Sequence, residues 1–63
     1  MHRIWFDPSL STPHDGDIVY VRLLNYEYYV IEAQYNDTSA SYRLQPSGIP
    51  IVYYEIARWS PIP

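Results

Sequence analysis

Cysteine and lysine are both absent from this chain of 63 residues, and glycine occurs only twice. Without cysteine the chain has neither a disulfide nor a thiolate metal site. Without lysine, four arginines carry all the positive charge against seven acidic residues, and the net charge is −3. Domains that bind nucleic acid usually carry a basic stripe, and loops that hold phosphate are rich in glycine. These shortages argue against nucleic-acid and nucleotide-phosphate binding.

Long apolar runs are also lacking, because no segment approaches the ~20 residues that cross a membrane. The first ten residues include Trp5, Asp7 and Pro8, whereas a secretory signal has a charged start followed by an apolar stretch. From this pattern we expect a cytoplasmic protein with no membrane partner.

Aromatic side chains are abundant instead: eight tyrosines, two tryptophans and one phenylalanine. A chain this short forms one domain, here residues 1–63, and buries only about 60% of the surface that its unfolded form exposes. Aromatic rings are one way to stabilise so small a core, because each ring buries a large apolar surface. Oligomerisation is another, and the sequence leaves it open.

Three segments alternate between apolar and polar residues with the period of a β-strand, namely residues 17–24, 28–35 and 40–45. They predict an all-β fold, a three-stranded antiparallel meander. Its core-facing side chains are expected to be Val19, Val21, Leu23, Tyr29, Ile31, Ala33, Tyr35, Ala40, Tyr42 and Leu44.

The register of this meander follows from parity, because a slip of one residue turns a strand inside out. A three-residue loop at residues 25–27 keeps both core sets on one face, and so does a four-residue loop at residues 36–39. The first loop pairs Leu23 with Tyr29, Val21 with Ile31 and Val19 with Ala33. The second pairs Tyr35 with Ala40, Ala33 with Tyr42 and Ile31 with Leu44.

The remaining segments are expected to flank this meander. Residues 1–6 suit a short edge strand, Asp15-Gly16 a turn, and residues 46–50 a loop. Residues 51–59 are ambiguous, because Val52, Ile56 and Trp59 have helical spacing whereas the run from Ile51 to Tyr54 has strand propensity. We favour a fourth extended strand that ends at Trp59.

The predicted outer face is unusually apolar, since Ile18, Tyr20, Leu24, Tyr28 and Val30 fall on it together. The same register sets Glu32 opposite Arg43, with Arg22 on the diagonal, in a row of alternating charge. Either the terminal segments fold over this face and complete a small, partly open barrel, or a partner covers it. Tyrosine and arginine are typical of interface hot spots. We therefore predict a partner-binding surface made of Tyr20, Arg22, Tyr28, Val30, Glu32 and Arg43.

Residue types that carry chemistry form no comparable pattern. His14, Asp15 and Asp17 share one turn, with His2 and Asp7 as further candidates, but a metal site needs three or four converging ligands. No serine lies in a Gly-x-Ser-x-Gly elbow. We expect no catalytic residue, no metal and no cofactor, and hence no enzyme.

Three landmarks recur in a known pattern: Trp5, the run Pro13-His14-Asp15-Gly16 before a hydrophobic strand, and an ending at Trp59-Ser60-Pro61-Ile62-Pro63. In this the chain resembles a small domain family of unknown function from bacteriophages and prophages, whose members finish close to Val-Thr-His-Trp-Met-Pro-Leu-Pro. The family's Thr-His is Ala57-Arg58 here, so any role of that histidine is absent. The resemblance implies a compact β-domain of phage or prophage origin and implies no activity.

Three hypotheses about function follow. The favoured one is a non-catalytic phage or prophage accessory protein that binds a host or defence protein in the host cytoplasm and modulates or inhibits it. The first alternative is a structural or assembly protein that associates with itself through the same face or an edge strand. The second alternative is a β-domain that binds nucleic acid. For Trp5 and Trp59 the favoured interpretation is structural, as two rings that close the open end of the core.

Overall fold

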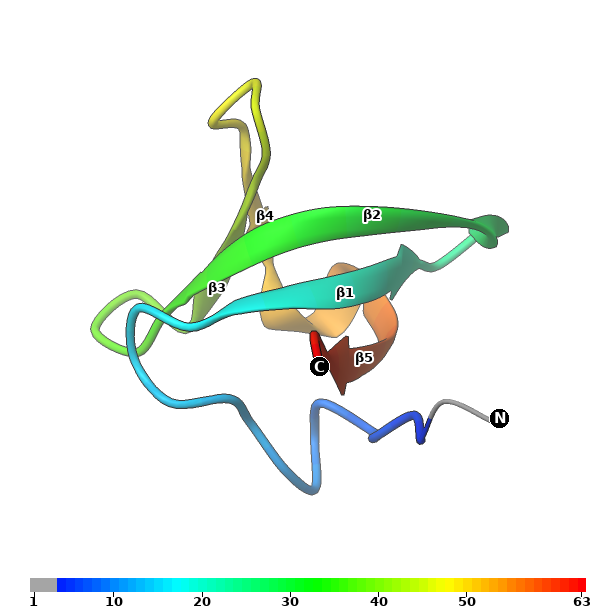
Figure 1. Cartoon of the computed structure of the whole chain (residues 1–63), viewed down its shortest axis with the longest axis horizontal. Coiled ribbons are helices and arrows are strands. Elements are labelled where there is room, and N and C mark those ends of the chain that lie inside the picture. The colour runs from blue at the N-terminus through cyan, green and yellow to red at the C-terminus, as the bar shows by residue number, and fades with distance from the viewer. Residues whose placement is uncertain (1–3) are drawn as a thin grey trace.

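A computed structural model describes residues 4–63, which form one antiparallel sheet in the order β4-β3-β2-β1-β5 (Figure 1). The elements are β1 (Ile18–Leu23), β2 (Tyr26–Asn36), β3 (Ser41–Leu44), β4 (Pro50–Val52), the 3-10 turn η1 (Tyr53–Glu55) and β5 (Ile56–Pro61). The predicted all-β class and the central meander are confirmed, and the sheet does not close into a barrel.

The strand β1 lies between β2 and β5 and pairs with both. The predicted pairs of Val19 with Ala33 and of Val21 with Ile31 are present. The predicted turn at Asp15-Gly16 is also present, and Gly16 has a φ of +87°, which glycine adopts without strain. The inner part of the first hairpin therefore follows the sequence pattern.

The outer end of this hairpin differs from the prediction. The register shifts beyond Val21, so that Leu23 pairs with Tyr26 and not with Tyr29. The chain reverses at Leu24 and Asn25, and the predicted three-residue loop at residues 25–27 is wrong. Asn25 has a φ of +69°, a left-handed conformation that asparagine tolerates. A tighter turn than expected thus removes Tyr29 from the core.

The second hairpin keeps the predicted faces but changes its partners. Ala33 pairs with Leu44 and Tyr35 with Tyr42, a displacement of two residues along β3. Because a slip of two preserves the face of every side chain, Tyr42 still enters the core. The four-residue turn covers residues 37–40, so Ala40 lies in the turn and not on the core face. The predicted partners of Tyr42 and Ala40 were therefore wrong.

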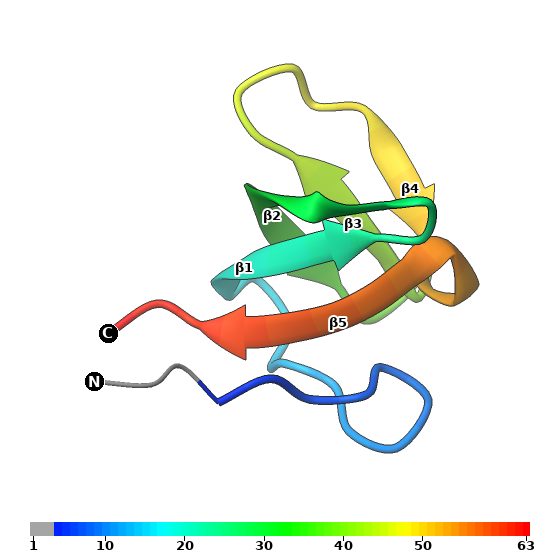
Figure 2. The same ribbon diagram turned by 90° about the vertical axis from the view of Figure 1, so that its right-hand side faces the viewer.

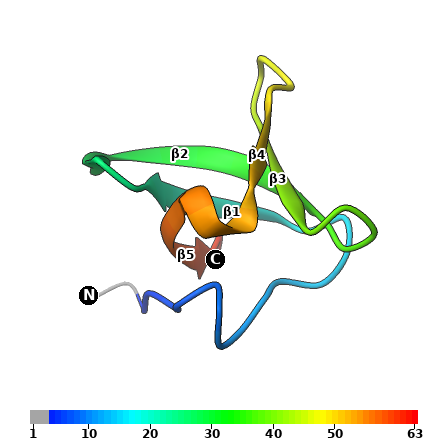
Figure 3. The ribbon, with the colours of Figure 1, turned by 180° about the vertical axis from the view of Figure 1, so that it is seen from behind.

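The C-terminal segment forms two short strands, where a single strand over residues 51–59 was expected. The turn η1 separates them and turns the chain away from β4, so that β5 pairs with β1 on the opposite edge of the sheet (Figure 3). The backbone N–H of Leu24 donates to the carbonyl of Glu55 at 2.9 Å, which fixes η1 against the first hairpin. The extended tendency prevails, because Val52 lies in β4 and both Ile56 and Trp59 lie in β5, with only the short η1 between the two strands.

The core lies on one face of the sheet and is built mainly from aromatic and β-branched side chains. The rings of Tyr35 and Tyr42 are 4.9 Å apart between centroids, and those of Phe6 and Trp59 are 4.8 Å apart. Trp59 thus closes the core as predicted, together with a phenylalanine from the N-terminal segment. The buried hydrophobic cluster consists of Val19, Val21, Ala33, Tyr35, Tyr42, Ile56 and Trp59.

The N-terminal segment runs beside β5 (Figure 2). Phe6 and Trp59 form an isolated antiparallel bridge, with backbone hydrogen bonds of 2.8 and 3.0 Å. Of the edge strand expected at residues 1–6, residues 1–3 lie outside the described part of the chain. Within residues 4–6 the pairing is limited to this one bridge.

The first prediction concerns Tyr42, whose hydroxyl is buried with no hydrogen-bond partner among the described residues. Burial, and next the neighbouring Tyr35, raise the pKa of this hydroxyl. Removing a buried polar group that has no partner costs no hydrogen bond. We expect Tyr42→Phe to leave the free energy of unfolding unchanged or to raise it by up to about 1 kcal/mol. Urea denaturation measures the change, with Val21→Ala as a control that should cost about 2 kcal/mol through its cavity. A loss of stability in Tyr42→Phe comparable to the control would contradict the account.

Candidate protein-binding surface

The outer face of the sheet is less continuous than the predicted register implied. Tyr20 lies between Glu32 on β2 and Ser60 on β5, so one predicted pair of site residues, Tyr20 and Glu32, is adjacent. Ser60 is only 1% exposed. The bridge from Phe6 to Trp59 sets Trp5 beside Ser60 in the antiparallel register. The N-terminal segment therefore covers one corner of the face.

Arg22 belongs to this covered corner and is half-buried. Its guanidinium carbon lies 4.5 Å from the centroid of the Trp5 ring, a cation–π distance, and its Nη1 donates to the carbonyl of Glu27 at 2.8 Å. The Nε atom of Arg22 is buried and has no hydrogen-bond partner among residues 4–63. The Arg22 side chain is thus held within the molecule, and Trp5 serves this face and not the core.

Arg43 is separated from Glu32. Gln34 lies opposite Arg43 on β2, and the Arg43 Nη1 donates to the carbonyl of Gly48 at 3.0 Å. The predicted row of Arg22, Glu32 and Arg43 is wrong, because the two-residue displacement of β3 moves Arg43 away from Glu32. Among the described residues the side chain of Glu32 has no ion pair, and it is exposed.

The remaining site residues, Tyr28 and Val30, lie on the half of β2 that extends beyond β3 (Figure 1). Pairing with β3 begins only at Ala33, so the segment 26–32 has no strand on that side within the described chain. Tyr28 is 93% exposed and Tyr29 63%, and their rings meet edge to face at 6.1 Å. We call residues 26–32 the overhang of β2.

Tyrosines that the sequence analysis did not assign to the site enlarge this aromatic surface. Tyr26 lies on the overhang, while Tyr53 and Tyr54 project from η1 beside Leu24, where they line a groove of ≈ 230 Å³. Tyr26 had been placed in a loop and Tyr29 in the core. One signal was available: adjacent tyrosines at 28 and 29 face opposite sides of a strand, so both are buried only if both faces are covered.

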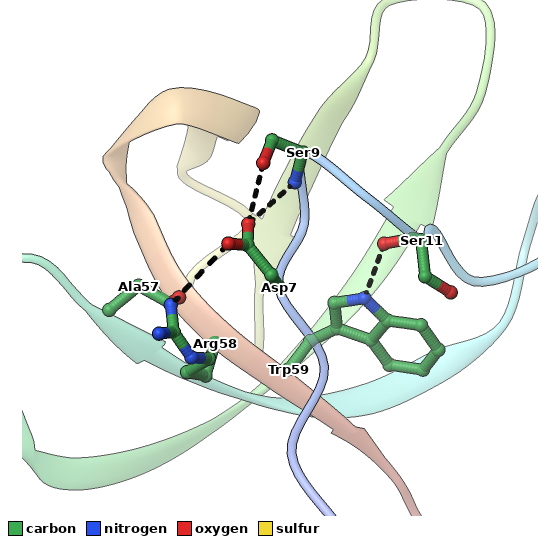
Figure 4. Close-up of polar contacts among 6 residues, drawn as sticks. All are labelled: Asp7, Ser9, Ser11, Ala57, Arg58 and Trp59. Atoms are coloured by element: carbon green, nitrogen blue, oxygen red, sulfur yellow. Dashed lines mark hydrogen bonds and ion pairs between the residues drawn. The ribbon is translucent and has the colours of Figure 1, made fainter.

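The densest polar cluster lies elsewhere, between the N-terminal segment and β5 (Figure 4). The Asp7 carboxylate accepts hydrogen bonds from the backbone N–H and the hydroxyl of Ser9, at 2.9 and 2.7 Å, and lies 4.0 Å from the Arg58 guanidinium. The indole N–H of Trp59 donates to the carbonyl of Ser11 at 2.8 Å. These contacts hold the N-terminal segment against β5, where it covers the core.

The environment of Asp7 lowers the pKa of its carboxyl group. The backbone hydrogen bond from Ser9 is the largest cause, followed by the Ser9 hydroxyl and, after a small opposing effect of desolvation, by the charge of Arg58. Arg58 also donates to the carbonyl of Ala57 at 2.6 Å. Arg58 thus stands in a structural cluster.

The residues considered as metal ligands do not converge. His14 lies 3.7 Å from Asp17 and both are exposed, while His2 lies outside the described residues. Within residues 4–63 no group of three histidine, aspartate or glutamate side chains is placed to hold a metal ion. The same part of the chain contains no helix of the length and apolarity that crossing a membrane requires.

Comparison with known proteins gives no relative: no family model, curated protein or solved structure matches the chain.

The second prediction follows from Asp7. Because folding lowers the pKa of this carboxyl group, its charged form stabilises the fold above the ordinary pKa of 3.8, and that contribution is lost as the pH falls through the lowered pKa. We expect Asp7→Asn to be less stable than the wild type at about pH 6, with a smaller difference at about pH 2.5. Urea denaturation of both proteins at both pH values measures this. A difference that does not depend on pH would contradict the assigned role of the charge.

Proposed function

We propose that this protein is a non-catalytic accessory protein of a phage or prophage, which binds a host or defence protein and modulates or inhibits it. The phage origin rests on the resemblance of the Trp5, Pro13–Gly16 and Trp59–Pro63 landmarks to the phage-associated family. The binding role rests on the molecule's own surface.

One observation carries the binding role, namely the cluster of exposed tyrosines on the overhang of β2. Tyr28 buries almost none of its surface, so its ring adds little to the stability of the isolated fold. Tyrosine offers a partner a large contact area with few rotatable bonds and a hydroxyl that can form hydrogen bonds, and it is enriched at interface hot spots. Tyr29 and Val30 extend the same apolar surface.

The position of this cluster also favours binding. Tyr28 and Tyr29 point to opposite faces of the overhang and both are exposed, so a partner reaches both faces of the strand at this point. Of the six residues proposed from the sequence, Tyr28, Val30 and Glu32 lie on the overhang, and Tyr20 adjoins it through Glu32. We retain these four as the binding surface, and we assign Arg22 and Arg43 to holding the hairpins in place.

The third prediction tests this proposal by affinity capture from an extract of the bacterium that carries the gene, followed by titration of the purified partner. We expect Tyr28→Ala combined with Tyr29→Ala to weaken binding at least about tenfold, because interface tyrosines commonly contribute more than 1 kcal/mol each. The control is Leu10→Ala, a change at an exposed apolar residue of the N-terminal segment.

Two results decide the test. Urea denaturation of the double variant should show a loss of stability below about 0.5 kcal/mol per site, which assigns the weakened binding to the surface. If the double variant and the control bind the purified partner as tightly as the wild type, the tyrosine surface is not the binding site and the proposal fails.

A further inference from the structure

Beside its tyrosines, the overhang of β2 presents an unpaired backbone edge. The hydrogen bonds that join Tyr35 to Gly16 and Asp17 show that, along the regular stretch from Ile31 to Tyr35, odd-numbered backbone groups of β2 point toward β1. Even-numbered groups point the other way, and the bond from the Gln45 N–H to the Glu32 carbonyl, at 2.9 Å, marks the end of the contact with the β3 side. Next along the strand, the N–H and C=O of Val30 face the side where the described chain provides no strand.

A notch opens at the same place. Its volume is ≈ 460 Å³, and it lies between β2 and the loop that follows β3, lined by Val30, Ile31, Glu32, Gln45 and Pro46. The β3–β4 hairpin projects away from β2 above this point (Figure 1), which leaves the edge accessible from the side. An unpaired edge of this kind is a template for one more strand.

The charge of the overhang identifies the kind of strand that fits. Residues 23–42 contain no lysine, arginine or histidine, and the overhang carries Glu27 and Glu32. Both carboxylates are exposed, and within residues 4–63 neither has an ion pair or a side-chain hydrogen bond. A second copy paired along this edge would gather four glutamates without a cation from either overhang, an arrangement that like charges disfavour.

From these observations we infer that the overhang of β2 binds an extended, basic polypeptide segment of the partner protein as a sixth strand of the sheet. This rests on the proposed binding function and specifies its chemistry. Backbone hydrogen bonds form at Val30. Because the Gln45 N–H already binds the Glu32 carbonyl at this edge, an arginine or lysine of the segment reaches the exposed Glu32 carboxylate from the position next to Gln45, beside the notch.

The register gives the segment a recognisable pattern. In an antiparallel arrangement, the residue opposite Val30 and the residue two positions before it share the outer face, and the earlier of the two lies at the end of the open edge, on the side of Glu32. The segment therefore carries a basic residue followed, two positions later, by an apolar or aromatic residue. Main-chain bonding supplies affinity in this mode of recognition, and the alternate side chains supply specificity.

The fourth prediction uses a library of random ten-residue peptides displayed on ribosomes and selected on the full chain. We expect enrichment of peptides with the basic–x–apolar pattern, and we expect the most enriched peptide, made synthetically, to slow hydrogen exchange at the Val30 amide. Glu32→Gln should weaken binding of this peptide about fivefold, because the charge-assisted hydrogen bond between the basic side chain and the carboxylate is lost. Glu55→Gln is the matched control and should leave affinity unchanged, because Glu55 is another exposed glutamate that has no ion pair within residues 4–63.

A second variant tests the backbone contact directly. Val30→Pro removes an N–H that faces the open edge, and such a position on an edge strand tolerates proline. Its circular dichroism should match that of the wild type while the peptide no longer binds. If Val30→Pro does not fold, two versions of the selected peptide replace it, one methylated at the odd-numbered backbone nitrogens and the other at the even-numbered ones. Only one of these two sets of N–H groups faces β2, so methylation of that set should abolish binding.

Three outcomes would overturn the inference: no enrichment of the pattern, equal affinity of Glu32→Gln and wild type, or a Val30 amide that the peptide leaves unchanged. Dimers of the chain that Val30→Pro abolishes would also overturn it, by assigning the edge to a second copy. If the purified partner protein still binds Val30→Pro and Glu32→Gln but not the Tyr28/Tyr29 double variant, the proposed function stands without the added strand. If the Val30→Pro, Glu32→Gln and Tyr28/Tyr29 variants all bind the purified partner as tightly as the wild type, both the added strand and the proposed binding surface are wrong.

Discussion

The unequal lengths of β2 and its two neighbours determine the arrangement of this molecule. β2 has eleven residues, whereas β1 has six and β3 has four. Its inner half, from Ile31 to Tyr35, pairs on one or both sides and carries part of the core. Its outer half has no strand on the β3 side in the part of the chain that the structure describes, so alternation no longer separates a buried from an exposed face there. The core and the aromatic surface are consequences of the same long strand.

The N-terminal segment completes the core at the β5 edge of the sheet. Phe6 stacks with Trp59, and the Asp7 carboxylate gathers the Ser9 donors near Arg58. Trp5, one residue earlier, packs over Arg22 on the outer face. Consecutive residues thus serve opposite faces of the sheet, as the pleat of an extended chain requires. A chain of 63 residues without disulfides obtains a closed core in this way.

Much of the fold is encoded in the alternation of apolar residues. Val19, Val21, Ala33 and Tyr42 enter the core as parity predicts, because only one face of each strand is buried. The errors arise at the turns. A two-residue reversal at Asn25 replaced the expected loop and exposed Tyr29, and a displacement of two residues in β3, which parity does not detect, separated Arg43 from Glu32.

The candidate surface was predicted less completely for the same reason. Tyr28, Val30 and Glu32 were assigned to it from their shared face, and this assignment needs only alternation. The overhang depends on where β3 stops pairing with β2, and that point follows from the position of the four-residue turn, at residues 37–40 in place of 36–39, and from the end of β3 at Leu44. A four-residue turn fits at either position, and a displacement of two residues leaves every side chain on the same face, so the pattern of apolar residues did not reveal it.

Amide hydrogen exchange at two adjacent residues tests the central claim most directly. In dilute protein the Ile31 N–H is paired with β1, whereas the Val30 N–H faces the open edge of β2. We predict that the Ile31 amide exchanges at least about a hundredfold more slowly than the Val30 amide, as expected when one amide opens only with the sheet and the other is free. Equal protection of the two amides would show that the edge is already covered and would contradict the account.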